Sequence, residues 1–99
     1  MTEREIELLG FERFDEEDLY NKSYHYYSYS VVMGLQFITN SSNEIEEEGE
    51  WYVELFDTDP TIRFYNFEEV QSLLNLLERR IFLKPEFKIF SDIKLKKNG

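Results

Sequence analysis

The sequence predicts an α+β fold: an antiparallel sheet of four to five strands, one long helix packed on one face and a short N-terminal helix. Side chains alternate between two faces over 24–33, which is the two-residue period of a strand. Apolar side chains recur at helical spacing over 67–82. The 99 residues are 41% hydrophobic and 17% aromatic, enough for one core but not for two, so we expect a single domain over residues 1–99.

The first elements are a short helix and the start of a strand. Thr2 and Glu5 have the spacing of a capping box, which predicts a helix over 3–9. A strand is expected to begin at 11–14. The four consecutive acids at 15–18 are interpreted as a solvated turn, because adjacent carboxylates share a sheet face only at a cost.

The middle of the chain carries the strand signals. The segment 24–33 is rich in aromatic and branched residues, which favour strands. Asn40 to Asn43 are turn-forming residues that would send the chain back. Further strands are expected at 35–39, 51–56 and 62–65.

The chain then changes to helical periodicity. Asn66 can cap a helix and Glu69 lies three residues later, so a helix should begin at Phe67. Pro85 disfavours helix at the residue before it, which predicts an end near residue 82. Apolar and basic side chains alternate over 87–95, which indicates a late strand with a basic outer face.

Charge is distributed unevenly along the chain. Residues 1–78 contain nineteen acids and four bases, whereas residues 79–99 contain seven bases and two acids, and the total is −10. The acidic part should repel nucleic acid and anionic lipid and attract basic proteins. The alternative is that the acids serve solubility alone. We therefore expect no direct nucleic-acid binding and no membrane association. The absence of cysteine and of a long apolar run favours a cytoplasmic location.

The segment 40–60 concentrates negative charge, with eight carboxylates and no Lys or Arg. In an extended chain, the even-numbered acids ahead of Trp51 would all project to one side, with Tyr52 and Phe56 beside them. Unpaired carboxylates are costly to bury, so this side would face solvent or a cationic partner. The residues predicted to bind a basic protein surface are Glu44, Glu46, Glu48, Glu50, Tyr52, Glu54, Phe56, Asp57 and Asp59.

A second interpretation of this face is structural. Another element, such as the N-terminal helix or the last strand, would cover the two rings. The basic segment 84–97 would then either neutralise the acids or form a separate site.

The sequence contains no pattern typical of an enzyme. The single histidine, His25, lies in an aromatic strand, where packing is its commonest role. The four glycines match no phosphate-binding loop, so no nucleotide cofactor is expected. Asp57 and Asp59 have the spacing of a turn, and no metal site is predicted. We expect a non-enzymatic binding protein.

The segments 9–11, 24–29, 51–57 and 67–77 together resemble small uncharacterised phage and prophage proteins. Some acidic proteins of that kind block the basic nucleic-acid grooves of host enzymes. The resemblance therefore implies a phage or mobile-element inhibitor that acts in the host cytoplasm. Two alternatives remain open, namely an immunity protein that neutralises a cognate toxin and an assembly protein that forms homo-oligomers.

Overall fold

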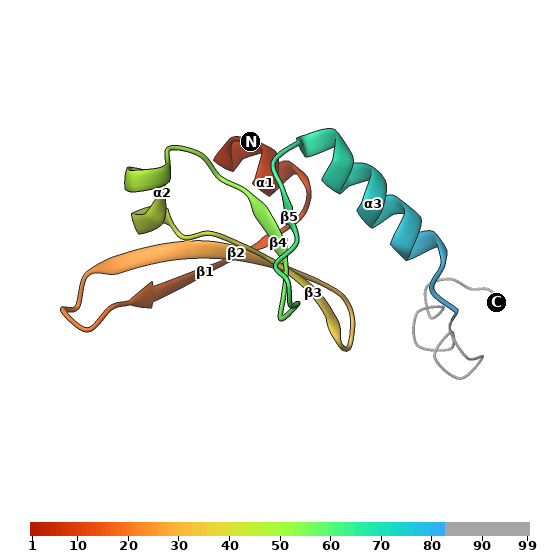
Figure 1. The fold of residues 1–99 in the computed structure, drawn as a ribbon. Helices are drawn as coiled ribbons and strands as arrows, with labels where there is room; N and C mark the ends of the chain where they lie inside the picture. The colour runs from red at the N-terminus through yellow and green to blue at the C-terminus, as the bar shows by residue number, and fades with distance from the viewer. Residues whose placement is uncertain (83–99) are drawn as a thin grey trace.

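The computed structural model describes residues 1–82, which form three helices and five strands (Figure 1). In chain order the elements are α1 (Glu3–Leu8), β1 (Glu12–Glu17), β2 (Ser23–Val32), β3 (Leu35–Thr39), α2 (Ser42–Glu48), β4 (Val53–Leu55), β5 (Arg63–Phe64) and α3 (Phe67–Arg79). The fold is α+β, as the sequence predicts.

The sheet has the strand order β1-β2-β3-β4-β5, and every neighbouring pair is antiparallel. Each strand therefore pairs with the next strand in the chain. The turn predicted over 15–18 is wrong in part, because β1 continues to Glu17. All six residues of β1 are exposed at this edge of the sheet, so its carboxylates stay hydrated and alternate between two faces.

The core lies on one side of the sheet. The side chains of Tyr27, Phe37 and Val53 project from β2, β3 and β4 and are almost completely buried. Ile6 of α1 and Val70 of α3 pack against them and are also fully buried. Burial of each such aliphatic or aromatic side chain contributes about 1.5–3 kcal/mol. Figure 1 shows the three helices gathered on this side of the sheet.

The caps of α1 and α3 confirm the predicted helix starts. The Thr2 hydroxyl accepts a hydrogen bond from the Glu5 backbone N–H, and the Glu5 carboxylate accepts one from the Thr2 backbone N–H. The Asn66 side chain accepts a hydrogen bond from the backbone N–H of Glu69. Both caps satisfy amide groups that the first turn of a helix leaves unpaired.

The prediction of one long helix over 67–82 is wrong in length, since α3 has 13 residues and ends at Arg79. The backbone N–H groups of Arg80 and Ile81 donate to carbonyls three residues earlier, at 3.0 and 3.5 Å. Such bonds tighten the last turn and terminate a helix. The strand predicted over 87–95 and the basic segment 84–97 lie outside the described residues.

Candidate functional site

One face of the sheet is turned away from the three helices, and we call it the open face. Cross-strand partners project to the same side, so the register defines a continuous row across all five strands. The residues of this row are Glu12, Ser28, Ile38, Glu54 and Arg63. The buried side chains of the described helices, Ile6, Val70 and Leu74, belong to the core on the other side of the sheet. The open face is therefore a candidate binding surface of the described fold.

Aromatic rings lie on the open face beside this row. Phe14 and Tyr26 are cross-strand partners on β1 and β2, and their rings are stacked with centroids 5.5 Å apart and planes at 17°. Phe14 remains 36% exposed. Sequence analysis missed this pair, although the alternation of β2 already placed Tyr26 opposite the core face.

The acids ahead of Trp51 do not form the predicted extended row. Ser42–Glu48 is the helix α2, and the left-handed Gly49 (φ 84°) ends it. The Glu44 carboxylate accepts hydrogen bonds from the Ser41 backbone N–H (2.8 Å) and hydroxyl (3.0 Å), which stabilises the first turn. A helix turns about 100° per residue, so Glu46 projects away from Glu44.

The remaining acids of this segment also point to different places. Glu46 lines a separate hollow beside Asp18 and Lys22. The Glu48 carboxylate accepts a hydrogen bond from Asn40 (3.2 Å), and Glu50 lies 3.9 Å from the amino group of Met1. The single anionic strand surface predicted for these residues is therefore wrong.

A smaller group of the predicted residues does come together. Glu44, Tyr52, Glu54, Phe56 and Asp57 line one hollow of about 410 Å³, which we call the acidic hollow. It opens between the first turn of α2 and the strands β3, β4 and β5. Asp59 is exposed in the turn after β4 and does not line it. Five of the nine predicted residues are therefore neighbours. They come from α2 and from the region of β4, and not from one continuous strand as predicted.

Tyr52 does not offer its ring to a partner, because it is only 6% exposed. The guanidinium of Arg63 lies 4.3 Å from the centre of the Tyr52 ring, and Tyr65 packs edge-on against the ring. Arg63 Nε also donates to Glu54 Oε2 at 2.7 Å. Burial raises the pKa of the Tyr52 phenol, while the positive charge of Arg63 opposes this shift.

Arg63 was not predicted as part of the site. It is the cross-strand partner of Glu54, so the β4–β5 hairpin brings the opposite charges together. It neutralises one carboxylate of the acidic hollow. Within residues 1–82, no ion pair neutralises Asp57 or Glu44, although Glu44 also caps α2.

Asn40 lines the acidic hollow and forms hydrogen bonds to the residues around it. It is 4% exposed, and its amide donates to the Glu50 carbonyl at 3.0 Å and to the Glu48 carboxylate. Its side-chain oxygen accepts a hydrogen bond from the backbone N–H of Tyr52 at 3.0 Å. One buried amide thereby connects the end of β3 to the segment that leads into β4.

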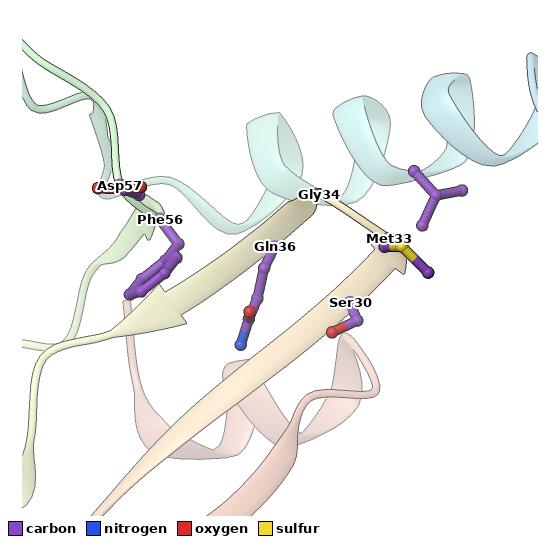
Figure 2. Close-up of a pocket in the computed structure, with 7 residues that line it drawn as sticks. Ser30, Met33, Gly34, Gln36, Phe56 and Asp57 are labelled. Carbon is purple, nitrogen blue, oxygen red and sulfur yellow. The ribbon is translucent and has the colours of Figure 1, made fainter.

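A second hollow lies beside the β2–β3 turn, and we call it the turn hollow. Its volume is about 450 Å³. Figure 2 shows Gln36 on β3, Ser30 on β2 and Phe56 after β4 around it, with Met33 and Gly34 in the turn. The turn hollow and the acidic hollow share Phe56 and Asp57, so they are neighbours on the same surface.

His25 is engaged in structural contacts. Its Nε2 lies 2.6 Å from Glu3 Oε2, and its ring packs against Trp51 with centroids 5.7 Å apart. The Tyr27 hydroxyl donates to the same Glu3 oxygen at 2.7 Å. Burial acts against the charge of Glu3, but the hydrogen bonds from Tyr27 and His25 outweigh it and lower the pKa of Glu3. These contacts fasten α1 to β2.

Within residues 1–82, no three His, Asp or Glu side chains are grouped in a way that could hold a metal ion. None of the helices in this part of the chain has both the length and the apolar character to cross a membrane. Comparisons with models of protein families, with curated protein sequences and with solved structures found no match.

Proposed function

We propose that this protein is a non-enzymatic binding module whose open face docks on a basic surface of another protein. The observation that supports this is the composition of the open face, where exposed rings lie among carboxylates. The described acids of its cross-strand row and of the two hollows are Glu12, Glu44, Glu54 and Asp57. The one described base among the lining residues, Arg63, is paired with Glu54.

The charge of the molecule supports the same partner. Residues 1–82 contain nineteen acids and six bases, a net charge of −13. Such an excess accelerates encounter with a positively charged surface and repels other acidic surfaces. Exposed aromatic rings then supply contact area that charge alone does not.

Basic protein surfaces of this kind commonly bind the phosphates of nucleic acids. A host protein whose nucleic-acid groove is covered by the open face would lose access to its substrate. We therefore propose inhibition of a host nucleic-acid-binding protein in the cytoplasm, the role of the phage inhibitor class. An immunity protein would use the same surface against a cognate toxin, and the genes adjacent to this one would distinguish the two.

Homo-oligomers are less favoured by this surface. Two copies that met through the open face would set Glu12 and Asp57 of one against the acids of the other. Such repulsion weakens with salt, because the Debye length falls from about 10 Å at 0.1 M to about 3 Å at 1 M. Sedimentation at low and high salt measures this alternative directly.

The test uses two double variants, each with two acids neutralised, and compares how fast they associate with a partner captured from host lysate. Glu12→Gln with Asp57→Asn removes two charges from the open face, and Asn tolerates the left-handed backbone of Asp57 (φ 64°). Glu46→Gln with Glu47→Gln removes the same charge from the exposed side of α2 and is the matched control.

We expect the open-face pair to slow association severalfold at low salt and to flatten its salt dependence, with little change for the control pair. Equal effects of the two pairs would show that only net charge matters. That result would contradict docking through the open face.

A further inference from the structure

The turn hollow carries more apolar surface than the turn itself requires. Val32 is 42% exposed, Met33 is fully exposed and Phe56 is 53% exposed. The turn needs Gly34, whose φ of 92° suits glycine, but it needs no apolar side chain at the two preceding positions. Single exposed apolar residues are ordinary, whereas a contiguous group beside a hollow is typical of a binding surface.

The charge next to the turn hollow indicates what it would bind. Asp57 lines both hollows, and Glu54 and Glu44 follow in the acidic hollow. No described base lines the turn hollow. A second copy of the chain would bring Asp57 carboxylates towards one another, so a cationic partner fits this edge better than a second copy does.

We propose that the basic partner inserts an aliphatic side chain into the turn hollow, directly beside a Lys or Arg that it places at Asp57. This inference rests on the proposed function and specifies the partner's chemistry. Met33 is unbranched and flexible, so it can close around aliphatic side chains of different shapes. Phe56 and Asp57 both line the turn hollow, so the aliphatic side chain and the basic residue of the partner would lie next to each other.

The experiment uses short lysine-rich peptides as probes with the full-length ¹⁵N-labelled protein. One peptide has a central leucine flanked by lysines, the second has alanine in place of leucine, and the third keeps leucine but replaces lysine with glutamine. Binding is followed by NMR shift changes at low salt. We expect the leucine peptide to bind about three- to tenfold more tightly than the alanine peptide, from the apolar area that leucine buries. Its shift changes should centre on Val32, Met33 and Phe56.

Two variants locate the effect on the protein. Met33→Ser should remove most of the advantage of leucine over alanine. Leu19→Ser is the matched control, because Leu19 is 96% exposed in the turn at the other end of β2. Since both side chains are exposed, neither change should affect folding. Phe56→Ala should have the same effect as Met33→Ser, with thermal unfolding used to verify that it is folded.

The outcomes separate the two proposals. Equal affinity for the leucine and alanine peptides, or equal effects of Met33→Ser and Leu19→Ser, would overturn this inference and leave the basic partner in place. Equal affinity for the glutamine and lysine peptides would overturn the charge requirement and so the proposed function. Absence of binding by every lysine peptide would overturn both.

Discussion

Asn40→Ala tests whether the acidic hollow is a built feature of the fold. Asn40 is buried and makes three side-chain hydrogen bonds, two as a donor and one as an acceptor. Alanine would leave the Tyr52 N–H and the Glu50 carbonyl without these partners. The Tyr52 residue is itself buried, so water cannot easily replace the lost bond.

A buried polar group left unsatisfied costs about 1–3 kcal/mol. The buried Tyr52 N–H carries this cost in full, whereas water can partly reach the carbonyl of the exposed Glu50, so we expect a total loss of about 2–4 kcal/mol. For a domain of this size, that loss lowers the melting temperature by roughly 10 °C or more. Urea unfolding followed by circular dichroism measures the free energy of unfolding. The control is Asn75→Ala on the exposed side of α3, where we expect a change within about 0.5 kcal/mol. A loss below about 1 kcal/mol for Asn40→Ala would show that the hollow does not depend on this amide.

Three further predictions concern the core residue Ile6, the contacts of Glu3 with β2, and the packing of Arg63 on Tyr52. Ile6→Ala should cost about 2–5 kcal/mol in urea unfolding, since Ile6 is fully buried, and a loss under about 1 kcal/mol would place α1 outside the core. The lowered pKa of Glu3 stabilises the fold at pH values above its ordinary pKa, and this contribution disappears as the pH falls through the lowered value. The stability difference between the native protein and Glu3→Gln should therefore shrink between about pH 6 and about pH 2, and a constant difference would contradict the Glu3 contacts. Arg63→Gln should leave the midpoint of urea unfolding almost unchanged, because the Arg63–Glu54 pair is partly exposed. It should increase the solvent accessibility of Tyr52, which photo-CIDNP measures. Unchanged accessibility of Tyr52 in this variant would mean that Arg63 does not shield the Tyr52 ring from solvent.

Local signals predicted most of the fold. The caps at Thr2 and Asn66 mark helix starts because they satisfy amides that no other group reaches. The alternation in β2 and β3 identifies the core face, because one residue in two must be apolar there. The strand order was not predicted, because β3 and β4 are joined through α2 and no local signal shows that these two strands pair. The extent of β1 was missed because an exposed edge strand needs no apolar alternation at all.

The site was less accessible to sequence reasoning. The glutamates around Ile45 alternate well enough to resemble a strand, but Ser41 with Glu44 and the later Gly49 are the cap signals of a short helix. Those signals were present and should have outweighed the alternation. The second interpretation foresaw a covered Tyr52 but named other elements, because the contact with Arg63 depends on the register of the β4–β5 hairpin. It is wrong for Phe56, which stays 53% exposed. Pairing register and side-chain packing decide such contacts, and neither is local in the sequence.

The most direct test of the account is hydrogen–deuterium exchange of the full chain, free and bound to the basic partner. We predict that binding slows exchange in β3 and in the turns that bear Met33 and Phe56, and leaves α3 unchanged. Slowed exchange confined to α3, with no change in these segments, would contradict a partner that docks on the open face.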